Sequence, residues 1–139
     1  LRRDLDRGRH RLETLLGPSF YPVFTPPWNR CSLQTLRYLH QAGYRAVSRS
    51  RASRPACPRG LTDAAVDVDL HTRKDPTPAA GWDLFLESLA CGLQRPVCGL
   101  MLHHQRMNAN AFEGLDCLLA LLKDQRRFVW EDFRGLCPP

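Results

Sequence analysis

Apolar and polar residues alternate along this chain with two different periods. Apolar residues recur at the spacing of a buried helix face in four segments, residues 2–16, 32–41, 81–93 and 112–122. Short apolar or alternating runs, which predict strands, lie at residues 20–24, 44–47, 64–71, 97–102 and 128–130. Ser32 is the expected N-cap of the helix that runs to about residue 41, and a last helical turn is predicted at residues 131–136. This order of elements predicts an α/β fold with repeated β-α units and a mainly parallel sheet.

The two most apolar helices are each predicted to bury one face. In the segment 81–93 this face consists of Trp82, Phe85, Leu86, Leu89 and Leu93. In the segment 112–122 it consists of Phe112, Leu115, Leu118, Leu119 and Leu122.

The loops that follow the predicted strands carry the chemically versatile residues. Because β-α units cross over with one handedness, the loops 25–31, 70–80 and 103–111 are expected on one face of the sheet. Ligands of such folds bind at that face. The residues expected there are Trp28, Asn29, Arg30, Asp69, His71, His103 and His104.

These residue types suit the hydrolysis of a carbonyl compound. The apolar run 97–102 ends in His103 and His104, and an imidazole can protonate a leaving group near neutral pH. The prolines before Trp28 fix the approach to its amide, which can stabilise an oxyanion, and Asp69 can hold a histidine in one tautomer. The alternative is a histidine pair that only caps a strand, beside an aspartate on a solvated sheet face.

Length and composition fit one soluble globular domain over residues 1–139. Hydrophobic residues make up 43% and charged residues 24% of the chain. No apolar run approaches the roughly 20 residues that span a bilayer, and the charged first residues are not a secretory signal. The chain also begins without a methionine, so we expect a processed product or a piece of a longer protein.

The net charge of +6 comes mostly from arginine. Arg49, Arg51, Arg54 and Arg59 fall in one Ser/Pro-rich segment, which predicts a solvated loop or, alternatively, a patch that attracts an anionic polymer. No aromatic residue lies among these arginines, which argues against nucleic acid as a partner.

Six cysteines are present, and none form a Cys-x-x-Cys pair, so a structural zinc site is not expected. Cys91, Cys98 and Cys117 lie in apolar segments and are predicted to be reduced thiols in the core. Reduced thiols slightly favour a cytoplasmic location.

Two segments together resemble the polysaccharide deacetylase family. Phe24-Thr25-Pro26-Pro27-Trp28-Asn29-Arg30, followed by a helix and Gly43-Tyr44, resembles the family's Arg-Pro-Pro-Tyr region. Leu100-Met101-Leu102-His103-His104 is similar to the closing Leu-x-His motif on the last barrel strand, and residues 67–71 stand where an acidic motif is expected. The similarity covers roughly residues 18 to 122.

The resemblance implies a partial or distorted β/α barrel and the removal of acetyl groups from an amino sugar or glycan. It implies catalytic roles for His103 as the acid, for the Trp28 amide at the oxyanion and for Asp69. Substrate binding is expected from Pro27, Asn29, Arg30 and His104. Thr25 stands where the family has an arginine that holds the catalytic base.

The resemblance also implies a divalent metal, commonly zinc, bound by an Asp-His-His set. The family's metal-binding Asp and His-x-x-x-His motifs precede the matching region, and no residues of this chain match them. We therefore expect the C-terminal portion of a barrel that does not retain the metal, is inactive or weakly active alone, and self-associates through open sheet edges.

Two other readings remain open at this point. The first is a non-catalytic β/α domain whose basic loop binds an anionic glycan or another protein. The second is a different metal-dependent hydrolase that uses His71, His103 and His104 as ligands, since three histidines with an open position suffice for catalytic zinc. Neither a membrane nor a nucleic acid is expected as a partner.

Overall fold

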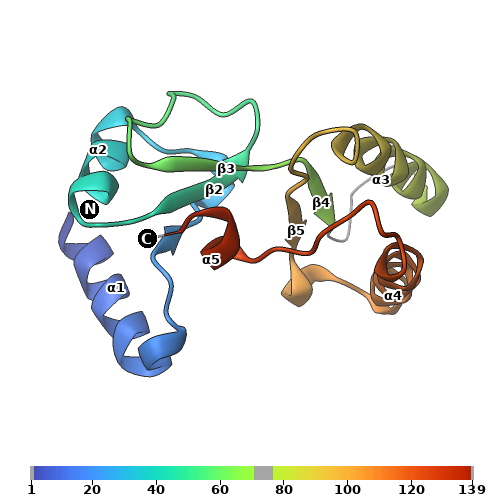
Figure 1. The fold of residues 1–139 in the computed structure, drawn as a ribbon, viewed down its shortest axis with the longest axis horizontal. Coiled ribbons are helices and arrows are strands. Elements are labelled where there is room, and N and C mark those ends of the chain that lie inside the picture. Colours follow the sequence, from blue (N-terminus) through green and yellow to red (C-terminus); the bar gives the residue numbers. More distant parts are fainter. Residues whose placement is uncertain (1, 71–76, 139) are drawn as a thin grey trace. The chain divides into compact units, whose positions relative to one another are not determined.

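The computed structural model describes residues 2–70 and 77–138. Its helices are α1 (Arg2–Leu16), α2 (Leu33–Gln41), α3 (Pro78–Gly92), α4 (Ala109–Lys123) and α5 (Phe133–Leu136) (Figure 1). Its strands are β1 (Val23–Phe24), β2 (Ala46–Ser50), β3 (Thr62–Val66), β4 (Val68–Leu70) and β5 (Leu100–Leu102). This mixture of helices with small parallel sheets confirms the α/β class.

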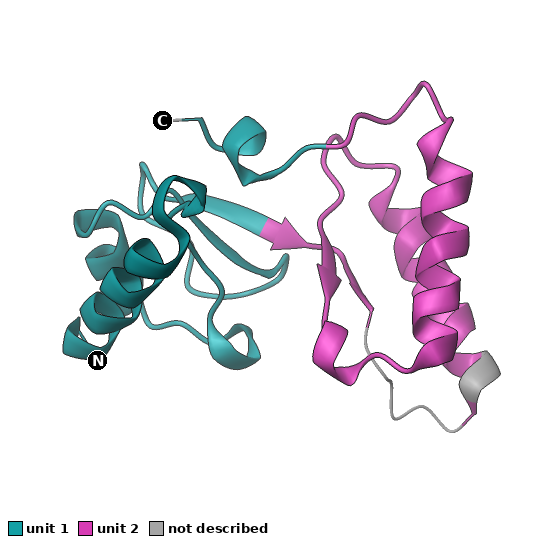
Figure 2. Ribbon diagram, turned by 90° about the horizontal axis from the view of Figure 1, so that it is seen from below, with its two compact units in different colours: residues 1–64, 131–139 teal, residues 65–130 magenta. Residues whose placement is uncertain are grey.

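The chain divides into two compact units, coloured separately in Figure 2. Unit 1 consists of residues 1–64 and 131–139, and unit 2 consists of residues 65–130. Unit 1 contains a sheet of strand order β1-β2-β3, in which β1 and β2 are parallel. Unit 2 contains the parallel pair β4-β5, in which Asp69 lies opposite Met101 and Leu70 lies opposite Leu102. Each parallel pair therefore presents its own carboxyl-terminal edge.

The core of unit 1 forms where α2 packs near β2. Leu36, Leu39 and Val47 are completely buried there. The helix begins at a cap predicted by the sequence, because the Ser32 hydroxyl accepts a hydrogen bond from the Thr35 amide at 3.1 Å. The same periodicity that predicted this helix thus also provides its buried face.

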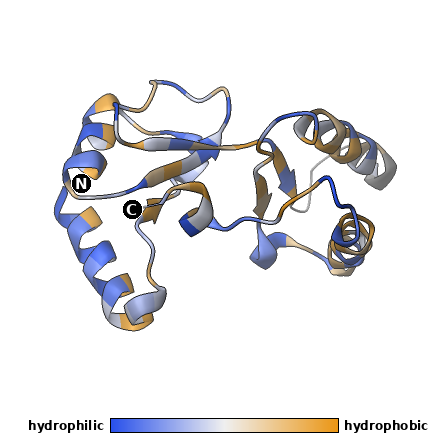
Figure 3. Cartoon of the chain, in the orientation of Figure 1, coloured by the Kyte–Doolittle hydropathy of each residue, from blue (hydrophilic) through white to orange (hydrophobic). Residues whose placement is uncertain are grey.

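Helix α1 contributes little to this core. It has no buried residue, and Figure 3 shows it as predominantly hydrophilic, whereas α4 is largely hydrophobic. Its attachment to unit 1 is mostly polar: Arg9 donates to the Ala42 carbonyl and the Tyr38 hydroxyl donates to Asp6. The amphipathic pattern therefore predicted the helix correctly, but packing uses only a small part of it.

The core of unit 2 consists of β4 with α3 and α4. Val68 and Leu70 are buried together with Phe85, Leu89 and Leu118. The two helices approach closely at Gly114, where a Cβ atom would collide with the Trp82 ring. A residue without a side chain is therefore required at that point of contact.

Element boundaries differ from the sequence prediction mainly in the strands. The predicted strand 20–24 shortens to residues 23–24, the strand 44–47 moves to 46–50, and the strand 97–102 shortens to 100–102. The run 64–71 divides between β3 and β4 at Asp67, and residues 128–130 form no strand. Helix α3 begins at residue 78, capped by Thr77, and α4 begins at residue 109, capped by Asn108. Side-chain caps extend both helices beyond their apolar patterns.

Several burial predictions are wrong. Leu86, Phe112 and Leu119 are 54%, 45% and 39% exposed, because each helix buries a narrower face than its apolar residues cover. Cys91 and Cys117 are exposed and are not core thiols, although all six cysteines are free. Their neighbours in sequence are apolar, but the helix turns the two thiols away from the core.

Candidate functional site

The residues nearest to catalytic geometry lie at the carboxyl-terminal edge of the β4-β5 pair. Asp69 belongs to β4, and His103 immediately follows β5. The parallel register brings them together, so that Asp69 Oδ1 lies 3.3 Å from His103 Nε2. Two residues separated by more than thirty positions thus form one carboxylate–imidazole pair.

The backbone holds His103 in place. Its amide donates a hydrogen bond to the Leu70 carbonyl at 3.1 Å, which extends the ladder one residue beyond β5. Its carbonyl accepts from the Arg106 amide at 2.7 Å, where a 3₁₀ turn over residues 104–106 begins. The imidazole is 45% exposed and the Asp69 side chain 38% exposed, so the pair is fixed but still accessible to a ligand.

This geometry suits proton transfer. A carboxylate beside one ring nitrogen orients the imidazole, and an imidazole can donate or accept a proton near neutral pH. His104 is exposed at the start of the 3₁₀ turn, next to the pair. The predicted meeting of Asp69 and His103 is therefore present in unit 2.

In unit 1, the turn over Pro27–Asn29 follows β1 and has an unusual backbone. Trp28 has φ 56° and ψ 23°, and Asn29 has φ 58°. These values lie in the left-handed region, which asparagine tolerates but which is unfavourable for a bulky side chain. Such outliers gather at functional sites, where the surrounding structure holds them.

Hydrogen bonds hold this turn rigidly. The amides of Asn29 and Arg30 donate to the carbonyls of Pro26 and Pro27 at 3.2 and 3.0 Å. The Asn29 side-chain oxygen accepts from the Ser50 amide at 2.8 Å, which ties the turn to the end of β2. The Trp28 amide donates to no backbone carbonyl among the described residues, which is the state that an oxyanion donor needs.

The predicted site residues thus form two groups. Asp69, His103 and His104 gather in unit 2, whereas the turn residues 27–30 gather in unit 1. His71 lies outside the described residues. That the two groups open onto one pocket stays a prediction.

The environment of Arg49 differs most from the prediction made from the sequence. This residue was predicted in a solvated loop, but it lies on β2 with its side chain completely buried. Its guanidinium donates to both oxygens of Asp63, at 3.1 and 2.6 Å, and to the Pro55 carbonyl at 2.7 Å. Hydrogen bonding to Asp63 raises the pKa of Arg49. The role of this cation is structural, since it ties the arginine-rich segment to the sheet.

The cysteines near Arg49 are poor nucleophiles. Burial raises the pKa of Cys57 to about 11, although Arg49 opposes the shift from 3.5 Å away. Burial also raises the pKa of Cys31, again against the effect of Arg49. Thiolates are the reactive form, so neither residue has the lowered pKa of a catalytic cysteine.

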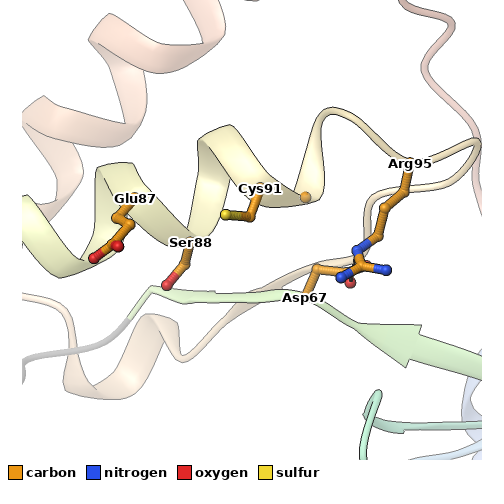
Figure 4. Close-up of a pocket in the computed structure, with 6 residues that line it drawn as sticks. Asp67, Glu87, Ser88, Cys91 and Arg95 are labelled. Carbon is orange, nitrogen blue, oxygen red and sulfur yellow. Dashed lines mark ion pairs between the residues drawn. The ribbon is translucent and has the colours of Figure 1, made fainter.

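A shallow pocket of about 290 Å³ lies in unit 2, lined by Asp67, Glu87, Ser88, Cys91, Gly92 and Arg95. Figure 4 shows Glu87, Ser88 and Cys91 on α3, with Arg95 directed toward Asp67. The Asp67 side chain is only 5% exposed; it accepts from the Gly99 amide at 3.1 Å and lies 3.4 Å from Arg95 Nε. Because these contacts join the amino end of β4 to the loop before β5, we assign this aspartate a structural role.

The described residues do not fit the metal that the family resemblance implies. Within residues 2–70 and 77–138, no group of three or more His, Cys, Asp or Glu side chains is arranged to hold a metal ion. Asp69 and His103 supply two donors only, and a catalytic zinc site needs three protein ligands. No catalytic step is therefore derived through a metal here.

Comparison with known proteins adds no family assignment. No protein-family model, no curated protein and no solved structure matches this chain. None of the helices in the described part of the chain is long and apolar enough to cross a membrane. The functional argument therefore depends on the geometry of the two residue groups.

Proposed function

We propose that this chain carries part of the active site of a polysaccharide deacetylase-like hydrolase, which removes acetyl groups from an amino sugar or glycan. The observation that carries the proposal is the Asp69–His103 pair, with 3.3 Å between Oδ1 and Nε2, at the carboxyl ends of two paired parallel strands. Active sites of β/α folds occur at that edge.

In the proposed reaction, water adds to the acetyl carbonyl carbon and the bond between that carbon and the amine nitrogen breaks. His103 donates a proton to the departing nitrogen, so that the products are acetate and a free amine. Asp69 acts as a positioning residue that orients the imidazole.

The proposed architecture is part of a β/α barrel. Two strand pairs, β1-β2 and β4-β5, are parallel, and helices follow β1, β4 and β5 in the chain. These are the features that barrel units share with open α/β sheets. The metal ligands and the base of such an enzyme are expected outside the residues that this chain matches, so the chain alone is proposed to be inactive or weakly active.

The proposal is tested with the whole 139-residue chain and an N-acetylglucosamine tetramer. Acetate release is measured enzymatically, and the ring protons of each histidine are followed by NMR during addition of the sugar. We expect slow release that His103→Asn lowers by about a hundredfold or to background, because general acid catalysis contributes at least that factor. We also expect the sugar to shift the His103 signals.

The matched control is His10→Asn, since His10 is an exposed histidine on α1 to which the proposal assigns no role. This variant should retain the wild-type rate, and the His10 signals should not respond to the sugar. Release that is equally fast in the His103 variant would contradict the proposal. The proposal would also be contradicted if no acetate were released and addition of the sugar left the His103 signals unchanged.

A further inference from the structure

The Trp28 side chain has no folding function that explains its presence. Its ring is 81% exposed, so it contributes almost nothing to a core. Its backbone also adopts φ 56°, a conformation that glycine or asparagine would adopt at lower cost. A tryptophan at this position therefore strains the backbone without stabilising a core. We infer that its ring serves to bind a ligand.

The turn that presents this ring is rigid. Pro26 is buried, the ring of Pro27 fixes its own φ angle, and the Asn29 side-chain oxygen accepts a hydrogen bond from the Ser50 amide at 2.8 Å. A rigid aromatic ring loses little conformational entropy when a ligand covers it. The geometry is that of a preorganised stacking platform beside the end of β2.

The surroundings of the platform are strongly basic. Residues 14–62 contain no Asp or Glu but seven arginines: Arg30, Arg37, Arg45, Arg49, Arg51, Arg54 and Arg59. Asp63 compensates the buried Arg49. Arg30, Arg54 and Arg59 are exposed, and no ion pair is found for them among the described residues.

Buried contacts bring this basic segment to the turn. Arg49 donates to the Pro55 carbonyl and contacts Cys57, which folds residues 51–57 back onto β2. Ser50, the next residue of β2, donates to Asn29 in the turn. The turn and the segment 51–57, which carries Arg54, therefore both lie at the carboxyl end of β2, whereas Arg59 lies nearer its amino end, where Gly60 lies close to His40 and the Thr62 amide donates to the Arg45 carbonyl.

We propose that the turn and the segment 51–57 bind a carbohydrate whose rings carry carboxylates. A sugar ring stacks on the exposed face of Trp28, and its carboxylate pairs with Arg30, two residues further along the chain. Arg54, in the segment that folds back onto β2, attracts a neighbouring carboxylate of the same polymer, and Arg59 adds to the positive charge of unit 1. Guanidinium groups match carboxylates in both charge and geometry. The choice of a carbohydrate rests on the proposed function, whereas the ring and the charges do not.

A single-stranded nucleic acid is the competing anionic polymer. Proteins that bind it combine a basic groove with several aromatic residues on which successive bases stack. Here one tryptophan stands at one side of the arginines, and residues 45–63 contain no aromatic residue among them. A polymer with one stacked ring and many charges fits this arrangement better.

The test measures binding of the whole chain to an oligomer of galacturonic acid and to its methyl ester, which lacks only the charge. We expect the acid to bind and the ester to bind at least about fivefold more weakly, with affinity falling as NaCl rises from about 0.05 to 0.5 M. Trp28→Ala should weaken binding about tenfold, and Arg30→Gln about two- to fivefold. Trp130→Ala and Arg126→Gln remove an exposed ring and an exposed charge from unit 2, and should change it less than twofold.

Several outcomes overturn the inference. These are equal binding of acid and ester, no effect of Trp28→Ala, or equal, Trp28-dependent binding of single-stranded DNA. A marked fall in melting temperature of Trp28→Ala also overturns it, because the ring would then be packed within the protein.

His103→Asn separates the two proposals, since it should abolish acetate release but preserve binding. If the chain releases acetate in a His103-dependent way but does not bind the acidic oligomer, only the inference is refuted. If the chain binds the oligomer through Trp28 but shows no His103-dependent release, only the proposed function is refuted.

Discussion

Two pairs of a basic and an acidic side chain, one in each unit, have carboxylates of nearly equal exposure, 37% for Asp63 and 38% for Asp69, but differ in the burial of the basic side chain. In unit 1, Arg49 is completely buried and donates to both oxygens of Asp63. In unit 2, His103 and Asp69 are 45% and 38% exposed and meet through one contact of 3.3 Å. Both pairs join neighbouring elements of a small sheet, so their position in the fold does not distinguish them.

Burial determines what each pair can do. A buried guanidinium must be satisfied by fixed partners, and Arg49 uses Asp63, Pro55 and Cys57 for this purpose. Its Nη1 has no hydrogen-bond partner among the described residues, but the whole side chain is buried, so a ligand cannot reach the guanidinium and it serves the fold. The imidazole of His103 is accessible to a ligand, which is why we assign chemistry to this residue. The predictions below test this contrast in order of decreasing effect.

The largest effect is expected from Arg49→Met. Removal of one partner from a fully buried pair costs about 3–5 kcal/mol, and we expect about 3 kcal/mol here because Asp63 is 37% exposed, while the Pro55 carbonyl also loses its donor. Urea denaturation followed by circular dichroism measures the change. Arg126→Met replaces an exposed arginine and should change stability by less than about 0.5 kcal/mol. Equal midpoints for the two variants would show that Arg49 is not a structural cation.

A smaller loss is expected from Gly99→Ala, which disturbs the frame of the second pair. A Cβ atom at position 99 would collide with the Ala65 carbonyl oxygen, and backbone cannot move aside as a side chain can. Overpacking of this kind costs about 1–3 kcal/mol. Gly8→Ala is the control, because its Cβ meets nothing within 4 Å and a helical alanine is favoured by roughly 0.5–1 kcal/mol. A tolerated alanine at position 99 would mean that the residue before β5 approaches the end of β3 less closely.

The thiol beside Arg49 provides a chemical test. Since burial raises the pKa of Cys57 from 9.0 to about 11, its thiolate fraction at pH 8 is about a hundredfold below the ordinary one. Iodoacetamide labelling followed by peptide mass spectrometry should therefore modify the exposed Cys91 and Cys117 long before Cys57. Rapid labelling of Cys57 in the native protein would contradict its burial beside the guanidinium.

The same shift predicts the sign of a pH effect. A raised thiol pKa means that folding favours the protonated form, so this stabilisation is present below pH 9 and is lost as pH rises through about 11. Denaturation midpoints should fall less steeply across this range in Cys57→Ala than in the wild type. A steeper fall in the variant would reverse the assignment.

The smallest effect on stability is expected from His103→Asn. Exposed ion pairs contribute about 0–1 kcal/mol, so the urea midpoint should hardly change while the proposed activity disappears. Loss of more than about 2 kcal/mol would show that this pair, like Arg49–Asp63, holds the fold together. The contrast between the two pairs would then be lost.

Local signals predicted much of the secondary structure. The leucine spacing of α1 and the Ser32 cap of α2 predicted both helices nearly to their ends, because helix formation depends on residues three and four apart. Strands were predicted less accurately, since β5 needs its partner β4 to define where pairing begins. The prediction for Arg49 was wrong for the same reason. Its charge favoured a solvent-exposed loop, and its burial depends on the ion pair with Asp63, fourteen residues further along the chain.

The amino-acid sequence by itself determined the α/β class, the helices and the candidate chemistry of residues 27–30, 69 and 103, because these depend on local pattern and residue type. Tertiary structure alone decided that Asp69 meets His103, that Trp28 adopts a left-handed turn, and that Arg49 is buried. Each of these facts depends on strand register or on contacts between distant segments, which have no local signature.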